Sequence, residues 1–177
     1  MKLSQIKYFT EAILDWDDDV DRGMPWQGEK DPYLIWLSEI LLQQTRVEQG
    51  LPYFVKFKES YPTIIDLANA PDDEVFRMWQ GLGYYSRCRN LLVTARHIAN
   101  NLGGIFPNRH EDIMKLKGVG PYTAAAIASF AYGINAPVVD GNVKRVISRY
   151  AGMELPVDGK EGIIHITDFS QMAIDSI

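Results

Sequence analysis

The sequence of 177 residues contains a single cysteine, Cys88, and has no run of about 18 or more apolar residues. One thiol excludes an internal disulfide, a four-thiolate zinc site and an iron–sulfur cluster held by this chain alone. The missing apolar run excludes a membrane-spanning helix, so no membrane partner is expected. The three histidines have no metal-ligand spacing, and no metal site is expected. These absences favour a reducing, cytoplasmic setting.

The composition that is present is globular, with 46% hydrophobic and 23% charged residues. A chain of this length forms one ordinary domain or two small lobes. The net charge of −5 argues weakly against nucleic acid as a partner. Residues 86–149 nevertheless carry nine Lys and Arg against three Asp and Glu. This segment predicts a local anion-binding face, although ordinary solvated surface explains the same pattern.

Helical periodicity runs through most of the chain, without sustained period-two alternation, so the fold class is expected to be all-α. Helices are expected at residues 4–16, 32–47, 49–60, 63–68, 71–79, 85–102, 109–116, 122–132 and 140–151. Asp31 followed by Pro32 marks one helix start, as N-cap and first helical residue. In the first helix one apolar stripe is expected, formed by Ile6, Phe9, Ile13 and Leu14.

The C-terminal part of the sequence predicts little regular structure. Residues 156–164 include two glycines and predict a weak, glycine-broken link. Residues 168–177 predict a short helical stub without a cap. A helix that stops on the apolar Ile177 indicates that the chain continues in a longer parent protein.

A glycine-rich turn joins two helical patterns at residues 116–124. Gly118 and Gly120 flank Val119 and let the backbone turn tightly, while Pro121 pre-sets the start of the next helix. The first N–H groups of that helix are suited to an anion such as a DNA phosphate. The pattern predicts a helix–hairpin–helix motif at about residues 109–132; the alternative is an ordinary tight turn between helices.

Two carboxylates stand in contrasting surroundings. Glu39 has almost only apolar neighbours, and desolvation there favours the protonated form that a general acid needs. Asp140 follows an apolar run and precedes a helix, so it is suited to an ionised N-cap. Such a pair cleaves glycosidic bonds through a cation-like transition state, and a base in DNA must be flipped out to reach it. The alternatives are a glutamate on a wet helix face and an aspartate that only caps.

Four segments together resemble the MutY-type adenine DNA glycosylases of the helix–hairpin–helix-GPD superfamily, which includes endonuclease III. They are residues 24–27 (Met-Pro-Trp-Gln), 36–45, 81–87 (Gly-Leu-Gly-Tyr-Tyr-Ser-Arg) and 140–145. The resemblance implies a two-lobed helical fold, with a six-helix barrel lobe at 27–134 and a second, incomplete lobe formed by 1–26 and 135–177. It implies a monomer that removes adenine opposite 8-oxoguanine or guanine from double-stranded DNA in base excision repair, in the cytoplasm or nucleoid.

The resemblance also implies roles for single residues. Glu39 matches the acid that protonates N7 of the flipped adenine, Asp140 the carboxylate that stabilises the sugar cation, and Asn142 the residue that orients these groups. Tyr122 stands where the bifunctional glycosylase/lyases carry a Schiff-base lysine. A phenol cannot form a Schiff base, so a monofunctional enzyme is implied.

Further positions match residues that contact the substrate. Arg22, Trp26 and Leu42 match the adenine pocket, and Gln171 matches a contact to the adenine edge. Gln44 and Tyr84 match residues that wedge into the duplex, beside which Thr45 contacts the lesion strand. Core packing is the alternative for Trp26, and a loop anchor for Tyr84. The remaining DNA-binding residues are expected to be Arg87, Gly118, Val119, Gly120 and Lys144.

The sequence departs from the family at its end. The full-length relatives continue with four cysteines, spaced C-x6-C-x2-C-x5-C, that hold a [4Fe–4S] cluster, and with a domain that recognises 8-oxoguanine. This chain is expected to be truncated before both, and Cys88 is expected to be a packing thiol. The hairpin is expected to hold a monovalent cation through backbone carbonyls. Two other functions stay open: a DNA-binding fragment without catalysis, and a bifunctional enzyme of the endonuclease III type.

Overall fold

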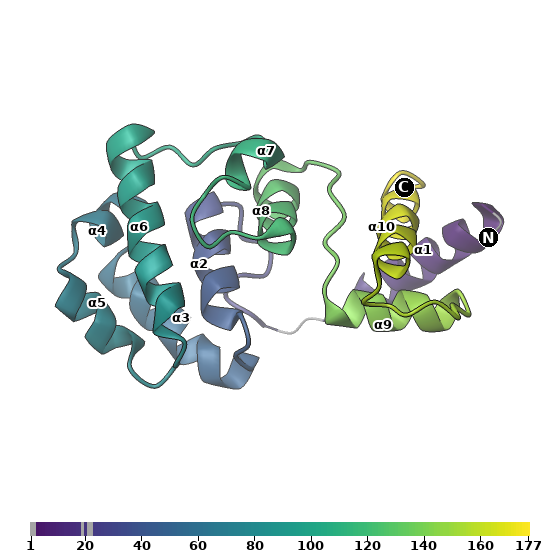
Figure 1. Cartoon of the computed structure of the whole chain (residues 1–177), viewed down its shortest axis with the longest axis horizontal. Coiled ribbons are helices and arrows are strands. Elements are labelled where there is room, and N and C mark those ends of the chain that lie inside the picture. The colour runs from purple at the N-terminus through teal and green to yellow at the C-terminus, as the bar shows by residue number, and fades with distance from the viewer. Residues whose placement is uncertain (1–2, 19, 21–22) are drawn as a thin grey trace. The chain divides into compact units, whose positions relative to one another are not determined.

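The computed structural model describes residues 3–18, 20 and 23–177, and these residues form helices and loops without any strand (Figure 1). The all-α prediction is therefore confirmed. The helices are α1 (Leu3–Asp18), α2 (Pro32–Leu42), α3 (Val47–Ser60), α4 (Ile64–Asn69), α5 (Asp72–Trp79), α6 (Tyr85–Asn101), α7 (His110–Ile113), α8 (Pro121–Tyr132), α9 (Gly141–Tyr150) and α10 (Lys160–Ile174).

The chain divides into two compact units. The central unit runs from Pro25 to Tyr132 and contains α2 to α8. The terminal unit combines Met1–Met24 with Gly133–Ile177 and contains α1, α9 and α10. Each unit has its own buried core.

Helix α2 is the core helix of the central unit. Its side chains from 33 to 38 are all buried, and Trp36, Leu37 and Leu41 are completely so. It packs against α3 on one side and against the alanine-rich α8 on another (Figure 1). The Asp31 carboxylate accepts a hydrogen bond from Tyr33 N at 2.8 Å, which confirms the predicted N-cap.

The end of α2 differs from the prediction of a helix over 32–47. The helix stops at Leu42, and Gln44 adopts a left-handed backbone with φ of 57°. The carbonyl groups of Ile40 and Leu41 accept hydrogen bonds from the Arg87 side chain on α6. These bonds satisfy carbonyls at the helix end, which lack partners inside the helix. The carbonyls at this helix end are therefore satisfied by a residue far away in the sequence.

The terminal unit is built around Ile6, Ile147, Ile166 and Phe169, one or two from each of its helices. The predicted stripe on α1 is partly wrong, because Ile13 and Leu14 are 40% and 44% exposed. Helix α1 packs on α10 through its first half, where Ile6 and Thr10 are buried. The Thr10 hydroxyl donates to the Ile6 carbonyl at 3.0 Å, which satisfies this buried polar group.

The C-terminal prediction is also wrong, because α10 already begins at Lys160 and ends at Ile174. Gly162, which looked like a helix breaker, is buried in the first turn of α10. A Cβ atom there would lie 2.1 Å from the Pro156 carbonyl oxygen. The glycine thus permits close approach of the helix to the preceding turn, rather than ending the helix. Helix α7 is shorter than the predicted 109–116, and turns follow it.

Candidate functional site

Glu39 lies on the last turns of α2 and is half-buried between the buried side chains of Ser38 and Ile40. One turn later, Gln43 Nε2 lies 3.4 Å from Thr123 Oγ1 on α8. This hydrogen bond joins the turn after Glu39 to the residue next to Tyr122, which is 37% exposed. The packing of α2 on α8 therefore brings the neighbourhoods of Glu39 and Tyr122 together.

Two residues predicted to line an adenine pocket lie against α3. The Trp26 ring meets the Phe54 ring edge to face, with centroids 5.3 Å apart and an interplanar angle of 82°. Leu42 packs on Gly50, where an added Cβ would lie 2.7 Å from Leu42 Cδ2. Gly50 and Phe54 are one helical turn apart, so Trp26 and Leu42 share a face of α3. The third predicted residue, Arg22, lies outside the described residues.

The residues predicted to enter the duplex stand on two neighbouring segments. Gln44 follows α2, and Tyr84 precedes α6; both are exposed, and Tyr84 is 63% so. Both have a left-handed backbone, with φ of 57° and 46°. Such values are uncommon outside glycine and cluster at functional sites. Thr45 is half-buried next to Gln44, and its hydroxyl lies 3.4 Å from Arg87 Nη2.

Arg87 is buried, with 9% of its surface exposed. Burial lowers the pKa of its guanidinium group. The group lies 5.3 Å from the Trp79 ring centre and 5.6 Å from that of Tyr84. The resemblance placed Arg87 among the DNA-binding residues, whereas here its hydrogen bonds go to the protein's own backbone and to Thr45.

The hairpin before α8 is fixed to α6. Gly118 has φ of +79°, and an added Cβ would lie 2.8 Å from Asn90 Cβ on α6. The Thr94 hydroxyl, also on α6, donates to the Lys117 carbonyl at 2.8 Å. Val119 is buried at 8% exposure, whereas Gly120 has open space beside it. The hairpin thus holds one side chain inward and leaves Gly120 accessible to a backbone or phosphate group.

In the terminal unit, Asp140 caps α9. Its Oδ1 accepts from Val143 N at 2.7 Å, and its Oδ2 accepts from Asn142 Nδ2 at 2.8 Å. Asp140 is half-buried and Asn142 exposed. Lys144 Nζ lies 2.9 Å from Asp158 Oδ1. The N-cap prediction for Asp140 is confirmed, and both carboxylate oxygens are held in a defined orientation.

Gln171 is half-buried on α10, where its Nε2 donates to Asp175 Oδ1 at 2.9 Å. The predicted residues thus fall into two sets. The terminal unit holds Asp140, Asn142, Lys144 and Gln171, and the central unit holds all the other described ones.

Three residues that support the site were not identified from the sequence. Gln49 and Tyr53 on α3 and Trp79 on α5 donate to carbonyls of the loop at 80–83. The partners of Gln49 and Tyr53 lie 32 and 27 positions away, so no local pattern points to these two contacts. The partner of Trp79 is only four positions away. Only the glycines at 81 and 83 indicate a special loop conformation there.

The described residues contain no group of three or more His, Cys, Asp or Glu side chains that could hold a metal ion. Cys88 is buried in α6, and burial raises the pKa of its thiol to about 12. The residues present therefore do not fit a [4Fe–4S] cluster, which needs several thiolates together. Within the same part of the chain, no helix has the length and apolarity needed to cross a membrane.

Comparison with known proteins gives a consistent result. Residues 37–161 match the family model described as HhH-GPD superfamily base excision DNA repair protein. An adenine DNA glycosylase of Buchnera aphidicola subsp. Baizongia pistaciae is 39% identical over 179 residues, which cover 94% of this chain and 51% of the relative. The adenine DNA glycosylase of Homo sapiens is 41% identical over 156 residues, covering 83% of this chain and 29% of the relative. The chain thus spans about half, or less, of these relatives' length.

Solved structures agree on the fold. A thermostable thymine-DNA glycosylase superposes with a TM-score of 0.82 and 29% identity, covering 97% of this chain and 85% of that one. A trapped covalent intermediate of endonuclease III with DNA gives a TM-score of 0.80 over 99% of this chain and 83% of that one. Its identity is 21%, so this second likeness concerns the fold alone.

Proposed function

This chain belongs to the HhH-GPD superfamily of base excision DNA repair proteins, and we propose that it is an adenine DNA glycosylase. The proposed reaction hydrolyses the N-glycosidic bond of an adenine paired with 8-oxoguanine or guanine in double-stranded DNA. The observation that carries the proposal is that the central unit has both a half-buried acid, Glu39 on α2, and a tyrosine, Tyr122, at the start of α8. The names of relatives 39% and 41% identical support the choice of adenine.

Glu39 is the proposed general acid. From its half-buried position on α2, it is proposed to donate a proton to N7 of the extruded adenine. Protonation lets the base leave with the electron pair of the bond between C1′ and N9. The resulting Glu39 carboxylate then takes a proton from the water that attacks C1′, so the acid is restored at the end of the cycle.

Asp140 is the proposed stabiliser of the sugar cation. Two hydrogen bonds, from the Asn142 amide and the Val143 backbone, fix the orientation of both carboxylate oxygens. A carboxylate fixed in this way is organised before the positive charge develops on the sugar, so little reorganisation is needed in the transition state.

Tyr122 makes the proposed enzyme monofunctional. A lyase needs an amine that forms a Schiff base with C1′, and a phenol does not supply one. The product is therefore an abasic site in an intact strand. Trp26 and Leu42, on one face of α3, are the proposed apolar walls for the adenine ring, and Gln171 is proposed to contact its edge.

The hairpin is the proposed anchor for the phosphate backbone, because Gly120 offers open space at the start of α8. A monovalent cation bound to hairpin carbonyls is part of the same proposal. The substrate implies an intracellular location with DNA, and a single copy of the chain is sufficient for the proposed chemistry.

The experiment is single-turnover excision on a duplex with one adenine opposite 8-oxoguanine. The strand is expected to break only after alkali treatment. Glu39→Gln should lower the rate by about 100-fold or more, since general acids contribute on that order, while duplex affinity stays within about threefold. Glu59→Gln, an exposed glutamate at the end of α3, is the matched control.

Two outcomes would overturn the proposal. If the unaltered chain binds the duplex but releases no adenine, it is a DNA-binding module. If borohydride traps a covalent adduct with abasic DNA, it is a lyase of the endonuclease III type.

A further inference from the structure

Two segments of the central unit carry exposed residues in a strained backbone conformation. Gln44 and Tyr84 both have positive φ, a conformation that disfavours residues with a Cβ atom. Such a conformation persists only where the surroundings enforce it. The question is therefore which contacts hold these two segments in place.

A single side chain contacts both segments. Nη1 of Arg87 lies 3.0 Å from the Ile40 carbonyl oxygen and 3.3 Å from that of Leu41, and it also donates to the Gln43 carbonyl. Nη2 lies 3.4 Å from Thr45 Oγ1 and 3.3 Å from the Leu82 carbonyl oxygen. One planar guanidinium group thus joins the end of α2 to the loop that carries Tyr84.

The chemistry of this contact requires arginine. A guanidinium group presents five N–H donors in a fixed plane, whereas a lysine offers a single compact charge. The buried positive charge faces the C-terminal end of α2, where the helix dipole is negative. It also lies 5.6 Å from the Tyr84 ring centre, so it touches the side chain that it helps to place.

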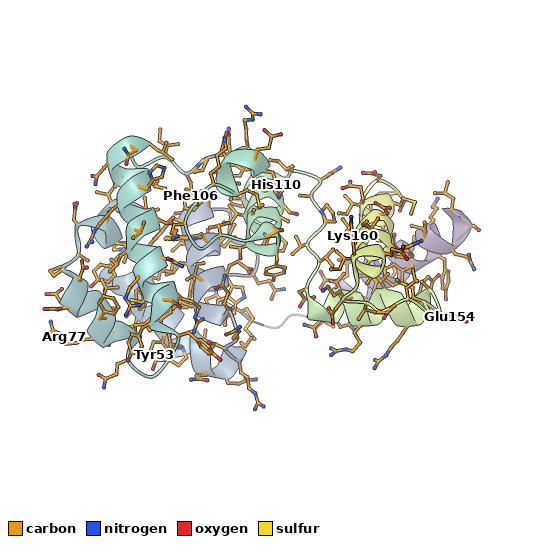
Figure 2. All side chains as sticks on the ribbon, viewed as in Figure 1. Tyr53, Arg77, Phe106, His110, Glu154 and Lys160 are labelled. Atoms are coloured by element: carbon orange, nitrogen blue, oxygen red, sulfur yellow. The ribbon has the colours of Figure 1, made fainter. Side chains whose placement is uncertain are left out.

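The second segment is anchored along its whole length. Each of the four carbonyls from Gln80 to Gly83 accepts a hydrogen bond from a side chain. The donors are, in order, Tyr53 Oη at 2.8 Å, Gln49 Nε2 at 3.3 Å, Arg87 Nη2 at 3.3 Å and Trp79 Nε1 at 2.8 Å. Tyr53 stands at the end of the unit where this loop turns (Figure 2). Arg87 is also the donor that hydrogen-bonds to the segment at 40–45, through the carbonyls of Ile40, Leu41 and Gln43 and the hydroxyl of Thr45.

We propose that Arg87 is a positioning residue that holds Gln44 and Tyr84 in register, so that both side chains enter the duplex together. The inference rests on the proposed function and assigns Arg87 an internal role in place of a direct contact to DNA. When a base is extruded, the two side chains are needed together: one fills the gap that the base leaves in the stack, and the other enters the base step that opens beside it. A rigid link between the two segments removes the cost of ordering each of them separately on binding.

Arg96 provides a matched control on the same helix. It also donates to backbone carbonyls, those of Ala68 and Ala70, each at 3.3 Å, and it pairs with Asp72. These partners lie at the end of α4 and the start of α5, away from both inserting segments. Arg96→Gln therefore reproduces the loss of an arginine–carbonyl contact from α6 without affecting Gln44 or Tyr84.

Hydrogen exchange of the free protein tests the geometry without any activity. In Arg87→Gln, amide exchange should become faster at 41–46 and at 81–86 together. In Arg96→Gln it should become faster only around 68–72. Faster exchange in just one of the two segments of Arg87→Gln would overturn the proposal. If Arg87→Gln does not fold, Arg87→Lys serves the same comparison, because lysine keeps the positive charge but lacks the planar set of N–H donors.

Kinetics then test the role. Arg87→Gln should lower single-turnover adenine excision by about 100-fold, a loss that a misplacement of about 1 Å can cause, and leave the Kd for an undamaged duplex within about threefold. The effects of Gln44→Ala and Tyr84→Ala on the excision rate should be non-additive in the unaltered chain. In the Arg87→Gln background the same two effects should be additive. A loss of undamaged-duplex affinity that depends on salt would instead show a direct phosphate contact. If the unaltered chain excises no adenine, the proposed function fails, while the exchange result still decides the link itself.

Discussion

Replacing Gly162 by alanine sets two physical effects of opposite sign against each other. Alanine is the better helix former, and by propensity alone the change would stabilise α10 by up to about 1 kcal/mol. The structure predicts the reverse. The new Cβ would lie 2.1 Å from the Pro156 carbonyl oxygen and 3.2 Å from Val157 Cα, both of them backbone atoms. The first distance is more than 1 Å short of ordinary contact, so either the helix or the turn must move.

Forcing such a shift typically costs about 1–3 kcal/mol, which exceeds the propensity gain. Because the clash is with backbone atoms, the upper part of this range, about 2–3 kcal/mol, applies here. After a helix-propensity gain of about 1 kcal/mol is subtracted, we expect Gly162→Ala to lower the free energy of unfolding of the terminal unit by about 1–2 kcal/mol. The assay is urea unfolding followed by circular dichroism, with hydrogen exchange over 156–174 to locate the effect. Gly141→Ala is the control, because a Cβ there meets nothing within 4 Å. An unchanged or higher urea midpoint for Gly162→Ala would refute the reasoning.

Three further results are expected. The backbone N–H of Asp31 lowers the pKa of Glu29 below its ordinary 4.5, so the carboxylate stabilises the fold above that pH and ceases to do so as the pH falls through the lowered value. Glu29→Gln should hence lower the urea midpoint at pH 7 but not at pH 2.5, and an equal loss at both would contradict this. Cys88 is buried with a raised pKa, so a thiol reagent should label it only after unfolding. Gly118→Ala should weaken both stability and duplex binding in titrations, because φ of +79° disfavours a side chain, whereas Gly120→Ala should leave stability unchanged.

The local part of the fold could be predicted from the sequence because its signals are local. Asp31 and Pro32 begin α2 as the sequence indicates, and Asp140 caps α9. Glu39 is half-buried, as its apolar neighbours suggested. Each of these features depends on residues within one or two helical turns, where spacing and residue type determine the outcome.

The end of α2 and the start of α10 could not be predicted in the same way. Helix α2 stops where Arg87, more than 40 positions later, accommodates its terminal carbonyls. Helix α10 includes Gly162, where the Pro156 carbonyl leaves no room for a side chain. Neither the distant arginine nor this close backbone approach can be deduced from helix propensity. The candidate site shows the same division, since two of the four side chains that hold the loop at 80–83, Gln49 and Tyr53, come from a distant helix, α3.

The central claim is that Glu39 gives a proton to an extruded adenine. The most direct measurement is the structure of this chain bound to a duplex with 2′-fluoro-deoxyadenosine, which resists cleavage, opposite 8-oxoguanine. We predict that the adenine is out of the stack, with N7 within hydrogen-bond distance of the Glu39 carboxyl group. An adenine that stays stacked in the duplex, or an extruded adenine whose N7 lies away from Glu39, would contradict the account.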